Sequence, residues 1–471
     1  MNNNDIVQKL WNLCNVLRDD GITYHEYVTE LTYILFLKMA EERDIEDEIG
    51  IPQNYKWEEL VKLDGVELTR VYKQALLDFS DKDGKLGIIY HNAATKIEEP
   101  KNLKKIFHEI NKLDWHSVDR DDMGDLYEGL LKRNADEKKS GAGQYFTPRV
   151  LIDSIVKLVD PKLGERIFDP AGGTLGFLIS ASQYLKSENN NYDDLTDEEW
   201  NFQREEAYSA CELVTDTHRL ATMNALLHGL DGHIELGDTL SEKGKSMKNY
   251  DVILSNPPFG TKKGGERATR DDLTYETSNK QLNFLQIIYN SLRKTGKARA
   301  AVVLPDNVLF EGGVGADIRK DLMNKCNLHT ILRLPTGIFY AAGVKTNVLF
   351  FTRGTTDREN TKEVMFYDLR TNQKNFNKGN PLKASHFEEF ETTFNLSDEE
   401  KEKLERWTKY SIEEIEKKEW SLDMGLIKDD SQIDHADLPN PIESAEEAIE
   451  KLDEAMDLLK GVIKELKVAG V

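Results

Sequence analysis

The sequence predicts an α/β protein whose main domain is a doubly wound, largely parallel β-sheet, preceded by a helical domain and followed by a helical tail. Short apolar segments alternate with helical segments between about residues 166 and 352, the pattern of a parallel sheet with crossover helices. Residues 1–138 show helical periodicity only. A charged stretch and a Pro-containing linker then separate the main domain, residues 139–430, from the tail, residues 431–471.

At 471 residues the chain is too long for one small core, so two or three domains are expected. A hydrophobic content of 39%, with 18 Phe, 17 Tyr and 6 Trp, is typical of a globular protein. The cysteines Cys14, Cys211 and Cys326 are too scattered for a disulfide framework or a metal site. The first residues do not resemble a signal peptide, and no apolar run reaches membrane-spanning length, so we expect a cytoplasmic protein.

The formal net charge is −23. A protein that binds DNA by itself is usually basic, because it must neutralise phosphates. The composition therefore indicates one of two things. Either DNA is not the substrate, or a partner protein supplies much of the phosphate contact.

The N-terminal region is expected to be a helical domain for packing or docking, since it contains no constellation of catalytic residues. Within Tyr24–Glu48, apolar residues such as Leu31 and Leu35 recur at helical spacing. Further helices are expected at Asp5–Arg18, Trp57–Leu63, Leu68–Asp78, Leu103–Ile110 and Met123–Asn134.

The main domain opens with a Gly-containing break at Ser140–Gly143, after which come Gln144, Tyr145, Phe146, Thr147 and Pro148. A helix is expected at Val150–Leu158, with Thr147 as its N-cap and Pro148 in its first turn. This stretch is either an ordinary capped helix or a wall around the carboxylate end of a ligand, because the free N–H groups of a helix start attract anions.

The alternation of strands and helices follows. Strands are expected at Arg166–Asp169, Ala207–Cys211, Ile234–Leu236, Asp251–Ser255, Ala300–Leu304, Thr330–Leu334 and Val348–Thr352. Helices are expected between them at Phe177–Leu185, Thr215–Leu227 and Asn283–Leu292, and surface helices at Glu388–Trp407 and Ile412–Glu419. Polar loops are expected at Thr261–Lys280 and Glu311–Gly315.

Three strands end in residues suited to a nucleoside ligand. A Gly-rich turn, Ala171–Gly176, follows Asp169 and Pro170, and its glycines let the backbone approach a ligand closely. Glu212 after the second strand can accept from both hydroxyls of a ribose, and Asp238 after the third from an adenine amine. Each feature alone is weak, because a single acidic residue there is usually a solvated cap. Three at successive strand ends favour a site.

The fourth strand ends in Asn256, Pro257, Pro258 and Phe259. Two consecutive prolines exclude a helix and a further ladder, so the chain leaves the sheet in a stiff, extended turn. The turn presents the Asn256 amide and a neighbouring carbonyl where open α/β sheets bind ligands. Together these oxygens can accept both hydrogens of an exocyclic amine, while Phe259 stacks on the ring that carries it. The alternative is a strand with a Pro-rich stop.

The order of these features resembles that of adenine-specific DNA methyltransferases and, over essentially the whole chain, that of the modification subunits of Type I restriction–modification systems. The resemblance implies a Rossmann-like sheet that binds S-adenosylmethionine (SAM) across its first three strand ends. It implies methyl transfer to the N6 amine of a flipped adenine, with Asn256, Pro257, Pro258 and Phe259 as catalytic residues. The implied cofactor contacts are Gln144, Tyr145, Phe146, Thr147, Asp169, Ala171, Gly172, Gly173, Thr174, Glu212, Asp238 and Asn256. The segment Leu334–Phe339 lies where the family contacts the flipped base.

The same resemblance implies several partners. They are double-stranded DNA, a separate specificity subunit that chooses the site and is shared by two copies of this chain, and a restriction subunit that translocates DNA. Methylation would protect host DNA from restriction. The tail carries a heptad seam at Ile442, Ala445, Ile449, Leu452, Met456, Leu459, Ile463 and Leu466. It is expected to bind the specificity subunit or, as the alternative, to pack against its own domain.

Two other functions stay open. An Asn-Pro-Pro-aromatic turn also serves methyltransferases that act on protein glutamine or on RNA, although the N-terminal helices and the tail disfavour them. A non-catalytic assembly scaffold is supported by Leu175 alone, because the family's Gly-rich turn most commonly has glycine there. A side chain at that position either crowds the cofactor or points away from it.

Overall fold

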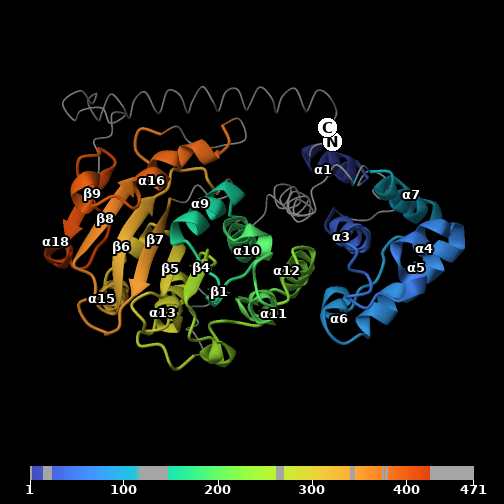
Figure 1. Cartoon of the computed structure of the whole chain (residues 1–471), viewed down its shortest axis with the longest axis horizontal. Helices are drawn as coiled ribbons and strands as arrows, with labels where there is room; N and C mark the ends of the chain where they lie inside the picture. Colours follow the sequence, from blue (N-terminus) through green and yellow to red (C-terminus); the bar gives the residue numbers. More distant parts are fainter. Residues whose placement is uncertain are drawn as a thin grey trace, which may run out of the picture. The chain divides into compact units, whose positions relative to one another are not determined.

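The computed structural model of the chain describes residues 3–13, 24–113, 115, 147–260, 270–339, 345–373, 376 and 380–424. These residues form an N-terminal group of helices and a nine-stranded sheet covered by helices (Figure 1). Both belong to one compact unit, Met1–Arg370 with Asn375–Leu426. The expected helix Met123–Asn134 and the heptad seam of the tail lie outside the described residues. Among the described helices, none has both the length and the apolar character that crossing a bilayer requires.

The N-terminal helices pack around aromatic side chains. Trp57 stacks on Phe107 with ring centroids 5.0 Å apart, and its indole N–H donates to Asn111. The helices are α1 (Asn3–Asn12), α3 (Tyr24–Glu42), η1 (Gln53–Tyr55), α4 (Trp57–Lys62), α5 (Gly65–Ser80), α6 (Lys85–Tyr90) and α7 (Pro100–Asn111). The predicted helix Tyr24–Glu48 ends early because Asp44 adopts a left-handed conformation with φ 59°. The sequence pattern did not indicate α6.

The sheet has the strand order β3-β2-β1-β4-β5-β7-β6-β8-β9. Its strands are β1 (Ile167–Asp169), β2 (Tyr208–Glu212), β3 (His233–Leu236), β4 (Val252–Ser255), β5 (Arg299–Pro305), β6 (Cys326–Arg333), β7 (Thr346–Arg353), β8 (Glu363–Asp368) and β9 (Trp407–Ser411). Strands β1 to β5 are parallel to one another, and β6 is parallel to β8. Strand β7 is antiparallel to β5 and β6, and β9 is antiparallel to β8. The seven predicted strands are confirmed with small shifts at their ends, and the Rossmann-like α/β fold with them.

Helices cover both faces of the sheet (Figure 1). Because side chains alternate along a strand, Ile167 and Val252 pack under α9 (Arg149–Val159) and α10 (Gly176–Glu188). Phe168 and Ile253 pack on the other face, under α13 (Lys280–Ser291). The helices after the N-terminal group are α9 (Arg149–Val159), α10 (Gly176–Glu188), α11 (Asp197–Asn201), α12 (Thr215–Leu227), α13 (Lys280–Ser291), α14 (Asn307–Phe310), α15 (Val314–Lys325), α16 (Glu388–Thr393), α17 (Asp398–Lys401) and α18 (Ile412–Lys417). Short helical turns are η4 (Asn190–Tyr192), η5 (Phe202–Glu206), η6 (Glu242–Ser246) and η8 (Ala384–His386).

The predicted surface helix Glu388–Trp407 is wrong. The segment forms α16 and α17, and its last residue begins strand β9. Ser397 and Glu400 form a capping box, which starts a new helix after α16 has ended. Trp407 is buried against Phe390 and Tyr367, so pairing with β8 and burial of this ring override the local helical pattern.

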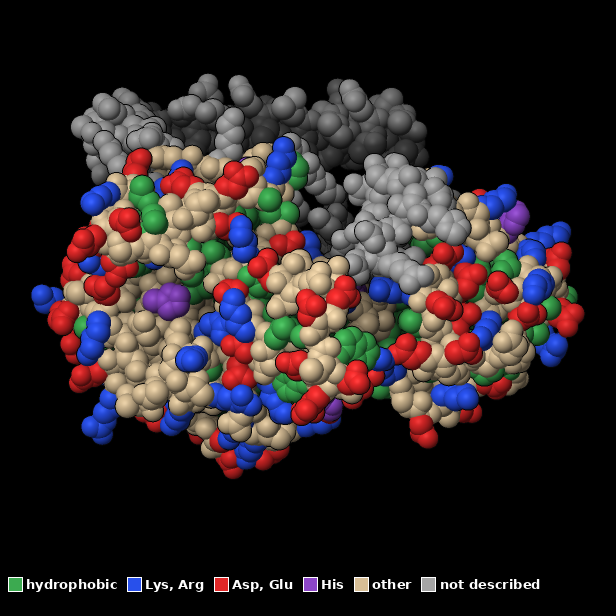
Figure 2. Space-filling model, in the orientation of Figure 1, with side chains coloured by type: hydrophobic (Ala, Val, Ile, Leu, Met, Phe, Trp, Pro, Cys, Tyr) green, Lys and Arg blue, Asp and Glu red, His purple; other side chains and the backbone are tan. Residues whose placement is uncertain are grey.

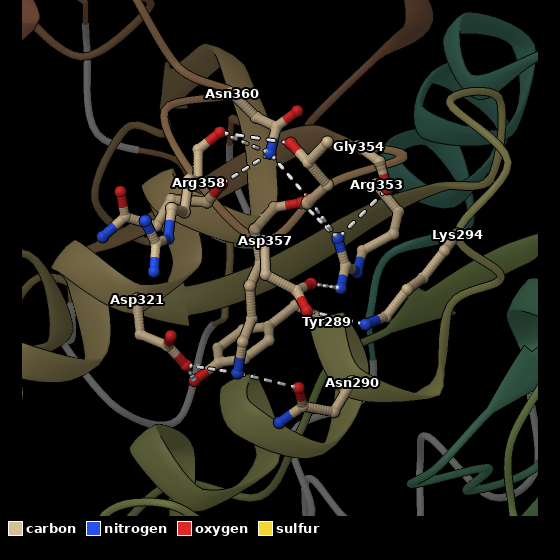
Figure 3. Close-up of polar contacts among 12 residues, drawn as sticks. Tyr289, Asn290, Lys294, Asp321, Arg353, Gly354, Asp357, Arg358 and Asn360 are labelled. Atoms are coloured by element: carbon tan, nitrogen blue, oxygen red, sulfur yellow. Dashed lines mark hydrogen bonds and ion pairs between the residues drawn. The ribbon is translucent and has the colours of Figure 1, made fainter.

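A buried arginine, Arg353, holds the chain together at the end of the sheet where β5 begins. Because β7 is antiparallel to β5, Arg353 lies beside Ala298 at the edge where β5 begins. Its guanidinium donates to the carbonyls of Lys325 (2.6 Å), Thr356 (3.0 Å) and Gly354 (3.1 Å), and it forms an ion pair with Asp357 (Figure 3). This network fixes the turn that follows β7 at the edge opposite the carboxyl ends of β1, β4 and β5.

Replacing Arg353 by Met should therefore destabilise the fold. The side chain is 2% exposed, and its loss removes the donor shared by three carbonyls. We expect the free energy of unfolding, measured by urea denaturation, to fall by about 3 kcal/mol. Lys294→Met is the matched control: Lys294 also pairs with Asp357, but its side chain is 57% exposed, so its loss should cost less than about 1 kcal/mol. Equal losses in both variants would contradict this account.

Candidate functional site

The carboxyl ends of four adjacent parallel strands meet at one edge of the sheet. The strands β3, β2, β1 and β4 are neighbours in that order, and the direction of winding reverses between β1 and β4. Asp169 ends β1, Glu212 ends β2, and Asp238 and Asn256 lie just beyond β3 and β4. A reversal of this kind opens a crevice where α/β proteins bind their ligands. The structure thus brings these four predicted residues to one edge.

Asp169 connects the two strands on either side of the reversal. Its carboxylate oxygen Oδ1 accepts from the Ser255 hydroxyl at 2.7 Å and from the Ala171 N–H at 3.0 Å. Burial raises the pKa of Asp169 to about 7, and the negative charge of Glu212 adds to the rise, while the two hydrogen bonds oppose it. The carboxyl is 2% exposed, so it acts here as a structural connection between the Gly-rich turn and β4.

Glu212 holds the Gly-rich turn to the end of β2. Its Oε2 accepts from the Gly173 N–H at 3.0 Å, and its Oε1 accepts from the Val214 N–H at 2.8 Å. Burial raises its pKa, and backbone hydrogen bonds oppose the rise. Each carboxylate oxygen can accept more than one hydrogen bond. Both therefore keep acceptor capacity for a ligand.

The Gly-rich turn has little room for side chains. A Cβ on Gly172 would lie 2.9 Å from that of Ala210, so only glycine fits without a shift. Leu175 has a left-handed backbone, φ 69° and ψ 22°, which glycine adopts at less cost. Its side chain is 1% exposed and belongs to the hydrophobic core beneath α9 and α10. The Thr174 carbonyl accepts from the buried Asn224 amide at 2.9 Å.

The loop after β3 reaches the same turn. The Thr239 hydroxyl donates to the Pro170 carbonyl at 2.6 Å, and Asp238 accepts from the Leu240 N–H at 2.8 Å. Leu213, Val214 and Leu236 are 62%, 45% and 38% exposed at the ends of β2 and β3. Sequence reasoning missed these apolar side chains. The sequence signal that could have identified them is the apolar pair Leu213–Val214 directly after Glu212.

The Asn256 amide makes a contact that the sequence did not predict. Its Nδ2 donates to the Thr147 hydroxyl at 2.9 Å, and its Oδ1 is buried without a hydrogen-bond partner in the described parts of the chain. The prediction that Thr147 caps the next helix is wrong. That helix, α9, begins at Arg149 after Pro148, and no side chain caps it. The Thr147 hydroxyl instead accepts from the turn after β4.

An aromatic pair lies beside this amide. Phe259 and Phe339 meet edge to face with ring centroids 6.2 Å apart. This contact brings the segment Leu334–Phe339 next to the Asn-Pro-Pro-Phe turn. Arg370 braces the same side, since it donates to the Leu334 carbonyl at 3.0 Å and forms a bidentate pair with Asp306 at 2.8 Å. The predicted residues Gln144, Tyr145 and Phe146 lie outside the described residues, as does part of the predicted loop Thr261–Lys280.

The chain matches two protein families. Residues 118–436 match the family described as N-6 DNA Methylase. Residues 6–113 match the family described as HsdM N-terminal domain. The first match includes all four strand ends at the candidate site, and the second includes the N-terminal helices.

Several known proteins are similar to this chain over nearly its whole length. It is 45% identical to the EcoKI methylase subunit, a Type I restriction enzyme subunit of Escherichia coli (strain K12), with 99% of this chain and 96% of that protein aligned. The StySJI methylase subunit of Salmonella typhimurium is 44% identical with the same coverage.

Two solved structures extend this similarity to the fold. The crystal structure of the EcoKI M protein has a TM-score of 0.57 at 40% identity, covering 98% of this chain and 96% of that one. A chain from work on complex assembly and conformational transition of the type I R-M system has a TM-score of 0.74 at 28% identity, covering 99% of both.

The raised pKa of Asp169 predicts a pH-dependent stability. A carboxyl whose pKa is higher in the folded than in the unfolded chain binds its proton more tightly when folded. Its contribution to the free energy of unfolding therefore falls as the pH rises from about 4 to about 7. The side chain that Asp169→Asn introduces does not titrate, so the free energy of unfolding of this variant should lack the decrease between pH 4 and pH 7. Relative to the wild type, the variant should therefore become more stable above pH 7. Urea denaturation between pH 4 and 8 measures it, and parallel curves for the two proteins would contradict it.

Proposed function

The chain belongs to the family of Type I restriction enzyme methylase subunits, and we propose that it methylates the N6 amine of adenine in DNA at the sheet edge described above, with SAM as the methyl donor. The observation that carries this proposal is the Asn256 amide, whose buried oxygen lacks a partner in the described structure. An acceptor of this kind suits the hydrogen of an amine.

The residues at the first three strand ends fit SAM. The two oxygens of Glu212 have acceptor capacity for the two ribose hydroxyls, and Asp238 for the amine of the cofactor's adenine. Leu213 and Leu236 offer exposed apolar surface to its ring. The methyl group of bound SAM is activated by its sulfonium, so no side chain has to form a covalent intermediate.

We further assign the remaining predicted contacts by resemblance to the family. Asp169, Ala171, Gly172, Gly173 and Thr174 form the floor of this cofactor site. By the same resemblance, Gln144, Tyr145 and Phe146 would contact its methionine end. The hydroxyl of Thr147, which the resemblance groups with them, bonds Asn256 in the structure.

The protein's own part in the reaction is orientation. Asn256 Oδ1 and the Pro257 carbonyl accept the two hydrogens of the target amine, which directs its lone pair to the methyl group. The base must leave the duplex to reach this turn, at a cost of a few kcal/mol. Phe259, beside Phe339, supplies the aromatic surface on which the flipped base stacks. Pro258 keeps the turn stiff.

A separate subunit would choose the DNA site. The chain carries a net charge of −23, and acidic side chains are interspersed among basic ones over the face shown in Figure 2. Such a surface is unsuited to hold DNA alone. We therefore propose a specificity subunit bound by two copies of this chain through the tail, residues 431–471, with a restriction subunit as a further partner.

The alternative function, a non-catalytic scaffold, rested on Leu175 alone. The side chain of Leu175 is buried in the core, so this residue gives no support to the scaffold alternative.

Asn256→Ala should abolish methyl transfer while SAM still binds. Removing one oriented acceptor of this type commonly lowers the rate by about 10²–10³-fold. Transfer of labelled methyl groups to DNA measures the rate, and calorimetry measures SAM affinity. Wild-type turnover in this variant would exclude the assigned role.

Glu212→Ala is expected to have the opposite effect to Asn256→Ala. It removes the proposed partner of the two ribose hydroxyls of SAM, and each hydrogen bond to a charged group contributes about 1.5–3 kcal/mol to binding. It should weaken SAM binding and leave Asn256 in place. Unchanged SAM affinity would place the cofactor elsewhere.

Truncation before Pro441 should separate assembly from cofactor binding. We expect the shortened chain to fold and bind SAM, but not to join the specificity subunit, since the apolar seam of the tail is lost. Size-exclusion chromatography with light scattering measures complex formation, and Leu452→Asp with Leu459→Asp is the local equivalent. A truncated chain that still forms the full complex would show that assembly uses another surface.

A further inference from the structure

We propose that Thr147 is a positioning residue that orients the Asn256 amide toward the target amine. The inference rests on the proposed function and assigns Thr147 a role through Asn256 instead of contact with the cofactor. The role is supported by one hydrogen bond, in which Asn256 Nδ2 donates to the Thr147 hydroxyl over a distance of 2.9 Å. The bond occupies the nitrogen end of the amide and leaves the oxygen end, Oδ1, without a partner among the described residues.

The orientation of this amide decides whether the site can work. An asparagine amide has an acceptor at one end and two donors at the other. Only the acceptor can pair with an amine hydrogen, so the reversed amide would place donors against donors. The terminal torsion of asparagine is broad, and rotation by half a turn exchanges the two ends. A second contact is needed to limit this rotation. A hydroxyl can accept from the nitrogen end of the amide or donate to its oxygen end, and in the structure the Thr147 hydroxyl accepts from Nδ2.

The backbone around Asn256 is already held from both sides. The preceding residue, Ser255, is 0% exposed, and its hydroxyl donates to Asp169 at 2.7 Å. The following residue, Pro257, is buried and has a fixed φ. The freedom that remains is the rotation of the side chain itself, which the bond to Thr147 restrains.

Thr147 is well placed to hold the amide. It precedes Pro148, which favours an extended backbone, and its branched side chain has few rotamers. The Pro148 carbonyl accepts from the N–H groups of Leu151 (2.9 Å) and Ile152 (3.1 Å), so the neighbouring residue is anchored to the first turn of α9. Leu151 is 0% exposed in the core beneath that helix. The hydroxyl therefore extends from a rigid support.

The test compares Thr147→Val, which keeps the shape and loses the hydroxyl, with Thr147→Ser, which keeps the hydroxyl. Both are assayed in the complex with the specificity subunit, by single-turnover methylation at saturating SAM and DNA and by calorimetry with SAM. Thr222→Val is the control: its hydroxyl bonds only the His218 carbonyl within α12 in the described structure, so its loss should leave the rate unchanged. Thr147→Ala gives a second measurement if the valine variant does not fold.

We expect Thr147→Val to lower the single-turnover rate by about tenfold, the weight of one neutral hydrogen bond, with SAM affinity within about twofold of the wild type. Thr147→Ser should restore the rate. A valine variant that methylates at the wild-type rate overturns the proposal, as does one that loses SAM affinity but keeps its rate at saturation. Because the wild type must be active in either case, this failure is distinct from failure of the proposed function.

Discussion

The hydrogen bond from Ser255 to the buried carboxyl of Asp169 joins β1 to β4 at the point where the strand order reverses. Parallel pairing of the two strands brings their carboxyl ends together, and this bond couples the turns that follow them. The Gly-rich turn begins beyond Asp169 and the Asn-Pro-Pro-Phe turn beyond Ser255. The Gly-rich turn and the Asn-Pro-Pro-Phe turn are therefore connected by one buried hydrogen-bonded pair.

This arrangement has a cost that the surrounding core must offset. Burial raises the pKa of Asp169 to about 7, and the left-handed backbone of Leu175 is a conformation that glycine adopts more readily. Strain and desolvation of this kind persist where the surrounding packing leaves no alternative. Here the core under α9 and α10 encloses Leu175, and Glu212 binds the N–H of Gly173 in the same turn. The turn that the site needs is thus supported from both sides.

The sequence predicted the fold and most of the site's framework. Apolar runs located seven strands, and the acidic residues at successive strand ends placed Asp169, Glu212 and Asp238 at a common edge because parallel strands end together. These features depend on local pattern and on general rules of α/β topology. The wrong surface helix Glu388–Trp407 shows the limit of such rules, since burial of Trp407 against Phe390, and not the local spacing, determines its strand.

The sequence by itself determined which functional groups stand at each strand end, and it determined a turn that two prolines keep extended. The tertiary structure alone decided how those residues use their hydrogen bonds. Thr147 lies 109 positions from Asn256, and nothing local indicates that its hydroxyl accepts from that amide and caps no helix. The same holds for Leu175, whose side chain could point to the ligand or to the core. Contacts between distant segments depend on the packing of whole helices on the sheet, and that packing is a property of the folded chain.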